Sequence, residues 1–111
     1  MPVLNLINLE CLDREEFWIW DADNPYLRIN GRDTFVGQMR EGNSTSLTHL
    51  SDITFTNNLK VELWEDDGSG NFWDDRLGAF YAEASEAGQG EHYFDFTQGG
   101  AHYQLTYEVI A

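Results

Sequence analysis

The residues with the strongest chemical signal lie between Trp64 and Gly78, in the stretch WEDDGSGNFWDDRLG. Five carboxylates and three glycines fall within these fifteen residues. Calcium is bound by roughly six to eight oxygen atoms, which flexible loops supply from carboxylates and backbone carbonyls. The stretch is therefore a candidate cation site, although acidic runs of this kind also occur as solvated hairpins that keep a protein dissolved.

The spacing of the acidic residues favours the cation site. Glu65 and Asp67 lie two residues apart at the end of a predicted strand, so their side chains point to the same side. Asp74 and Asp75 come just before the next predicted strand, and glycines between the two pairs let the backbone turn back. We expect the two pairs to meet, with carbonyl groups of the loop completing the ligand shell.

A helix-loop-helix calcium hand fits the same stretch less well. Counted from Glu65, such a hand has acidic residues or Ser at its first, third and fifth positions and Gly70 at its sixth. Its closing position, however, falls on Arg76, which cannot ligate a cation, and the segment before it has the pattern of a strand. The calcium hand is therefore set aside.

Strands must position these residues, because short segments that alternate with period two recur between turn signals. The segment LKVELW leads directly into the acidic stretch, and Asn30-Gly31 after PYLRI predicts a two-residue hairpin turn. Residues 41–48 are polar and predict a connection, and strands resume at Leu77. About eight short strands predict an all-β protein, a two-sheet antiparallel β-sandwich that forms a single domain over residues 1–111.

The acidic stretch and one earlier segment resemble the calcium loops of C2 domains, which are eight-stranded β-sandwiches. Trp64-Glu65-Asp66-Asp67 is similar to the opening of the third calcium loop of that family, and Asp75-Arg76-Leu77-Gly78 is similar to its close. Asp23-Asn24-Pro25-Tyr26 resembles the end of the first calcium loop, with Asn24 where an acidic residue is usual. The third loop is longer than usual by about two residues, and Glu65 replaces an aspartate.

The resemblance implies a calcium-binding module that acts as a buffer, a sensor or a calcium-dependent adaptor. It implies that the third loop supplies Glu65, Asp67 and Asp75 as ligands and that the first loop contributes Asp21 or Asp23. Together with the spacing argument, these are the expected metal ligands: Asp21, Asp23, Glu65, Asp67, Asp74 and Asp75.

Aromatic residues accompany both candidate loops, at Phe17, Trp18 and Trp20 before the first and at Phe72 and Trp73 within the third. Packing inside the protein is one interpretation. The other is that loop-tip aromatics meet a membrane or a protein partner once calcium has neutralised the acidic residues around them. Six scattered Lys and Arg residues cannot build the basic patch that many C2 domains use on membranes, so only calcium-dependent membrane binding would remain.

Composition limits the partners. The chain carries 20 acidic residues against six Lys and Arg, a formal charge of −14, which repels nucleic acid and favours cations and basic proteins. An alternative function is therefore an acidic inhibitor or immunity-type protein that caps a basic active site. No nucleophile motif or phosphate-binding loop indicates an enzyme. The single Cys11 and the absence of a signal-like start predict a cytoplasmic protein.

Overall fold

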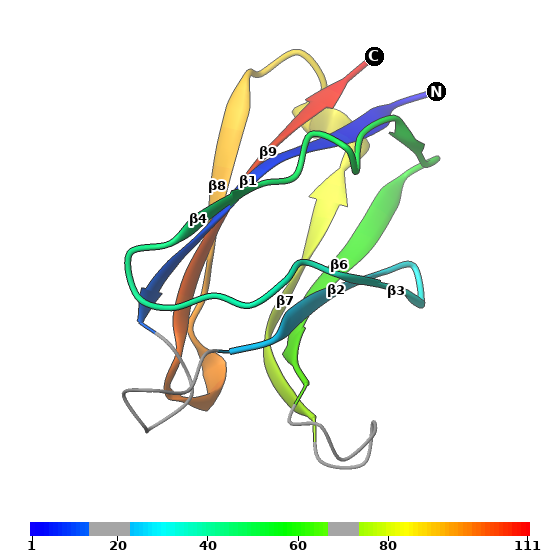
Figure 1. Ribbon diagram of the computed structural model, residues 1–111. Helices are drawn as coiled ribbons and strands as arrows, with labels where there is room; N and C mark the ends of the chain where they lie inside the picture. The colour runs from blue at the N-terminus through cyan, green and yellow to red at the C-terminus, as the bar shows by residue number, and fades with distance from the viewer. Residues whose placement is uncertain (14–22, 67–73) are drawn as a thin grey trace.

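The computed structural model describes residues 1–13, 23–66 and 74–111. In this part, the chain forms nine strands and two short 3-10 helices, Ala84–Glu86 and Gln98–Gly100 (Figure 1). The strands are β1 (Val3–Asp13), β2 (Pro25–Ile29), β3 (Arg32–Phe35), β4 (Ser44–Ser46), β5 (Ile53–Thr54), β6 (Asn58–Glu65), β7 (Asp75–Glu83), β8 (Glu91–Phe96) and β9 (His102–Ile110). No helix within the described residues is long and apolar enough to cross a membrane.

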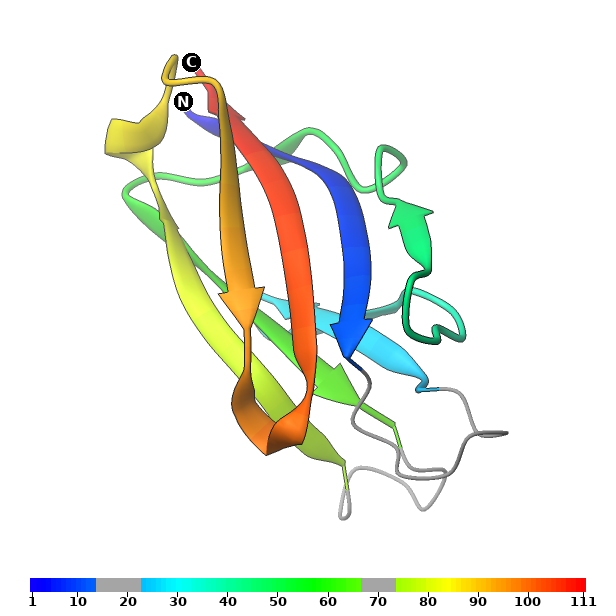
Figure 2. The same cartoon turned by 90° about the vertical axis from the view of Figure 1, so that its left-hand side faces the viewer.

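The strands form two antiparallel sheets that lie face to face (Figures 1 and 2). One sheet has the order β4-β1-β9-β8, with β5 paired to β1 beside β4, and the other has the order β3-β2-β6-β7. The predicted antiparallel β-sandwich of about eight strands is therefore confirmed.

A single apolar core fills the space between the sheets, because the inward positions alternate with polar ones along each strand. In β6, Leu59, Val61 and Leu63 are buried, as the period of LKVELW predicted. In β9, Leu105 and Val109 alternate with half-buried residues on the outer face. Burial of each such side chain stabilises the fold by about 1.5 to 3 kcal/mol.

The predicted hairpin at Asn30-Gly31 joins β2 to β3. Asn30 has a φ of 52° and Gly31 has a φ of 80°. Both values lie in the left-handed region that the two-residue turn requires and that asparagine and glycine tolerate. Tyr26 pairs with Phe35 in the resulting ladder, so the turn sets the register of the edge strand β3.

Two boundaries differ from the sequence-based prediction. Residues 41–48 were expected to be a connection, but Ser44–Ser46 form β4, which pairs with β1. A short edge strand of small polar residues carries no apolar alternation that could have indicated it. Asp75 and Arg76, expected to lie in the acidic loop, instead begin β7 opposite Glu65 and Trp64.

The two ends of the sandwich differ: one holds the chain termini and the other holds a group of acidic residues. The N- and C-termini lie together at one end, because β1 and β9 are neighbouring antiparallel strands (Figure 1). At the opposite end, β6 finishes while β2 and β7 begin. We call this second end the acidic end, after the carboxylates Asp23, Glu65, Asp66, Asp74 and Asp75 that flank β2, β6 and β7 there.

Candidate cation site at the acidic end

The register of the four-stranded sheet brings the carboxylates of the acidic end together. Glu65, the last residue of β6, pairs with Pro25 at the start of β2 and with Asp75 at the start of β7. Neighbouring strands lie about 4.8 Å apart. Three consecutive strands therefore place Asp23, Glu65 and Asp74 around one edge of the sheet, although they are distant in sequence.

Asp23 and Glu65 are buried, with 0% and 1% of their surface exposed. The Asp23 backbone is fixed by a two-way bridge to Met39, with both N–H···O distances at 2.9 Å. The Asn24 amide donates to Glu65 Oε1 at 3.3 Å, and the Asp66 amide donates to the Asn24 carbonyl at 3.0 Å. These contacts hold the start of β2 against the end of β6.

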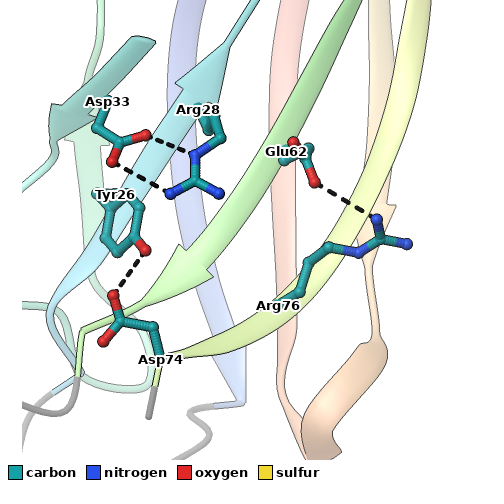
Figure 3. Close-up of polar contacts among 6 residues, drawn as sticks. All are labelled: Tyr26, Arg28, Asp33, Glu62, Asp74 and Arg76. Carbon is teal, nitrogen blue, oxygen red and sulfur yellow. Dashed lines mark hydrogen bonds and ion pairs between the residues drawn. The ribbon is translucent and has the colours of Figure 1, made fainter. Parts of the chain in front are cut away.

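Two tyrosines connect the core to the carboxylates. The Tyr103 hydroxyl donates to Asp23 Oδ2 at 2.5 Å. The Tyr26 hydroxyl donates to Asp74 Oδ2 at 2.6 Å (Figure 3). Burial and, next, the hydrogen bond to the carboxylate raise the pKa of both phenols, so each remains a donor near neutral pH.

The arginines of the neighbouring surface pair with carboxylates outside the expected ligand set. Arg28 Nε lies 2.7 Å from Asp33 Oδ1, and its guanidinium carbon lies 4.8 Å from the ring centre of Trp64. Arg76 Nη1 lies 3.4 Å from Glu62 Oε2 (Figure 3). The hydrogen bond to Asp33 raises the pKa of Arg28. Both ion pairs reach the solvent and therefore add little stability.

The six expected ligands have different outcomes. Asp23 and Glu65 are buried at the acidic end, Asp74 is half-buried there, and Asp75 is exposed on the first residue of β7. Asp21 and Asp67 lie outside the described residues. The aromatic residues expected at the loops also lie outside them: Phe17, Trp18, Trp20, Phe72 and Trp73. Within the described ranges, no group of three or more His, Cys, Asp or Glu residues could hold a metal ion.

Asp23, Glu65 and Asp74 come from three separate chain segments and reach the same end of the sandwich. They do not by themselves form a group that could hold a metal ion. Sequence reasoning missed Tyr26 and Tyr103 as residues of this site. Tyr26 stands inside the segment that resembles the first calcium loop, whereas nothing near Tyr103 in the sequence connects it with an aspartate 80 residues earlier.

No protein-family model matches the chain, and no curated protein sequence matches it either. Solved structures similar in fold include the following two. Human GIVD cytosolic phospholipase A2, in complex with methyl gamma-linolenyl fluorophosphonate inhibitor and terbium chloride, has a TM-score of 0.53 and 14% identity. The match covers 98% of this chain but only 16% of the phospholipase chain.

The second structure is Drosophila C2-DSL-EGF1, with a TM-score of 0.52 and 13% identity. That match covers 99% of this chain and 67% of the other. At such identities the likeness concerns the fold alone. It agrees with the C2-like β-sandwich that the loop motifs predicted.

Proposed function

We propose that the protein is a calcium-binding C2-like module that holds the ion at the acidic end of its sandwich. The observation that carries this proposal is the burial of two carboxylates, Asp23 and Glu65, where β2 and β6 meet. Ionised carboxylates are costly to bury unless they are paired, hydrogen-bonded or bound to a metal. Carboxylates at such a position are therefore candidate ligands.

The site would be completed by the residues around it. Asp74 is held beside the edge of the sheet by Tyr26, and Asp75 begins β7 opposite Glu65. Asp21 and Asp67 remain in the proposed ligand set on the basis of sequence alone. The protein carries a net charge of −14, and its acidic side chains repel one another. A bound calcium ion would neutralise part of this charge.

The proposed role is binding rather than catalysis. As a buffer the module would need only the ion, whereas as a sensor or calcium-dependent adaptor it would also need a protein partner that recognises the calcium-loaded end. Association with a membrane would likewise depend on calcium, because anionic lipid attracts basic segments and repels so acidic a chain until bound cations offset part of its charge.

The test compares thermal unfolding with and without calcium. A ligand that binds only the folded state stabilises it by about 2.7 kcal/mol at 100 times its Kd, so millimolar calcium should raise the melting temperature. Terbium, a hard cation named with the phospholipase structure, should bind in the same place and emit after excitation of the protein's tryptophans.

The matched variants are Glu65→Gln and Glu108→Gln, which remove the same charge. Glu65 ends β6 at the acidic end, whereas Glu108 lies on β9 opposite Asn5, toward the termini. Glu65→Gln should abolish most of the calcium-dependent stabilisation and the terbium signal, and Glu108→Gln should preserve both. Equal effects of the two substitutions would attribute the binding to net charge. No stabilisation of the unaltered protein at millimolar calcium would favour the acidic-inhibitor function instead.

A further inference from the structure

A pocket of about 400 Å³ lies away from the acidic end. One wall is formed by the β2–β3 hairpin together with the start of β6, and the other by residues 49–54, which include β5. Its volume falls in the lower part of the range of small-molecule pockets, about 300 to 1,000 Å³. The pocket is independent of the proposed calcium site, because β6 begins at the pocket and ends at the acidic end.

The charge of the pocket is opposite to that of the protein as a whole. Its described lining includes Arg32 and His49 but no Asp or Glu, in a chain with 20 acidic residues and six Lys and Arg. The side chain of Arg32 is exposed and forms no ion pair or hydrogen bond with the rest of the described chain. Its five N–H donors are therefore available to an anionic ligand.

Hydroxyl groups stand beside this cation. Arg32 and Thr34 are two residues apart on β3, so their side chains lie on the same face of the strand. Thr34 lines the pocket and is half-buried, and Thr54 contributes a second hydroxyl from β5. A carboxylate accepts hydrogen bonds from a guanidinium in a planar two-point arrangement and can accept further ones from hydroxyl groups.

The remaining lining is apolar. Ile29 and Leu59 belong to the core, and Leu50 and Ile53 are half-buried and pack against it. A ligand that fits both parts has an anionic head and an apolar body. The acidic protein disfavours a head with more than one negative charge, because long-range repulsion grows with ligand charge while the pocket offers one guanidinium.

We propose that this pocket binds a small organic monocarboxylate, with the carboxylate at Arg32 and an apolar body against Ile29, Ile53 and Leu59. Charge complementarity within an acidic chain selects the head group, and the apolar wall selects the body. A lone inorganic anion would leave the apolar wall in water, and an amine would meet the guanidinium.

The probe is decanoate at concentrations below micelle formation, titrated into the labelled protein in the presence of a calcium chelator. We expect saturable shifts in the methyl NMR signals of Ile29, Leu50, Ile53 and Leu59. Decanol and decyl phosphate should bind about tenfold more weakly or worse, and decylamine should give no saturable shift at these methyls. Because the chelator removes calcium, decanoate binding is measured independently of whether the protein binds calcium.

Three variants test the role of Arg32. Arg32→Gln should weaken decanoate binding by about tenfold, and Arg32→Lys should have an intermediate effect, because lysine keeps the charge and loses the planar fork. The matched control is Lys60→Gln: Lys60 adjoins Leu59 in β6 but is exposed, on the face opposite the buried Leu59 and Val61. Decanoate affinity should change less than twofold in this control, and each variant's melting curve verifies that it is folded.

The proposal is overturned if decanoate gives no saturable shift of the lining methyls, or if decylamine binds there as tightly. It is also overturned if Lys60→Gln weakens binding as much as Arg32→Gln does, because net charge would then account for the effect. If Arg32→Gln does not fold, the ratio between unaltered protein and Arg32→Lys decides: equal affinities would show that the guanidinium fork has no part in binding.

Discussion

The hydroxyl of Tyr103 lies 2.5 Å from Asp23 Oδ2, and neither residue exposes any surface to solvent. Tyr103 belongs to β9 of the five-stranded sheet, whereas Asp23 precedes β2 of the four-stranded sheet. This hydrogen bond therefore connects the two layers at the acidic end. It fixes the position of a carboxylate that backbone contacts within one sheet would leave adjustable.

Removing that hydroxyl should destabilise the fold. We expect Tyr103→Phe to lower the free energy of unfolding by about 1 to 3 kcal/mol, because the buried Asp23 loses a donor that it cannot replace with water. Urea denaturation measures this change. The control is Tyr93→Phe, since Tyr93 is 63% exposed on β8 and its loss should cost less than about 0.5 kcal/mol. Similar losses for the two variants would contradict the importance of the buried bond.

Stability should fall at alkaline pH, beginning near pH 9. Burial raises the pKa of the Cys11 thiol from 9.0 to about 11, so above pH 9 the unfolded chain loses this proton while the folded chain keeps it. The contribution of the protonated thiol to the free energy of unfolding is fully present below pH 9 and is lost as the pH rises through 11. Each unit of difference between the folded and unfolded pKa corresponds to about 1.4 kcal/mol. Above pH 10, Tyr26, Tyr103 and Tyr107 act in the same direction because their pKa values are also raised.

The measurement is a series of urea unfolding curves between pH 8 and pH 11. Cys11→Ala should reduce the slope of stability against pH between 9 and 11, whatever its effect on the absolute stability. An unchanged slope would show that the thiol does not contribute to the pH dependence.

Gly78 should not tolerate a side chain. A Cβ at this position would lie 2.8 Å from Phe96 Cδ1 and 3.3 Å from the Phe96 Cα, across the interface between the two sheets. We expect Gly78→Ala to lower the free energy of unfolding by about 1 to 3 kcal/mol or more, since neither the buried ring nor the backbone can move freely. In Gly42→Ala the new methyl group meets open space, and the cost should be limited to the backbone strain of about 1 kcal/mol.

Asp75→Asn should weaken calcium binding if the proposed function holds, because it removes a charged oxygen at the start of β7 while leaving the backbone pairing to Glu65 intact. We expect a loss of about tenfold or more in affinity by calorimetry. Asp95→Asn serves as its control: Asp95 is similarly exposed on a strand, but it contacts His102 and Gln104 on the other sheet. An unchanged affinity in Asp75→Asn would remove this residue from the ligand set.

The fold could be predicted from the sequence because local signals agreed with it. The alternation around Val61 and the Asn30-Gly31 turn each specify a strand or a hairpin from a few neighbouring residues. β4 could not be predicted, because Ser44–Ser46 become a strand only by pairing with β1. The same limit applies to the start of β7. Asp75 is a residue type typical of loops, yet it is paired with Glu65 in the sheet.

The candidate site was predictable only in part. Glu65 and Asp75 pair across β6 and β7 at one end of the sandwich, and their role as metal ligands stays a prediction. Their different environments followed from packing: Glu65 is enclosed and Asp75 is exposed, although both are acidic residues beside the same stretch. The pocket beside Arg32 had no local signal, because its walls come from segments that meet only when the two sheets pack.

The pairing of β1 with β9 sets the order in which the protein can be assembled during synthesis. Val3 pairs with Ile110, so β1 obtains its main partner only after the residues of β9 have left the ribosome. The four-stranded sheet, by contrast, is complete once residues 25–83 have emerged. Contacts between distant segments form late because closing a long loop is entropically costly. The apolar face of β1, with Leu4, Leu6 and Leu9, therefore stays exposed longest in the nascent chain. We expect this face to be the main site at which a chaperone or the ribosome prevents aggregation.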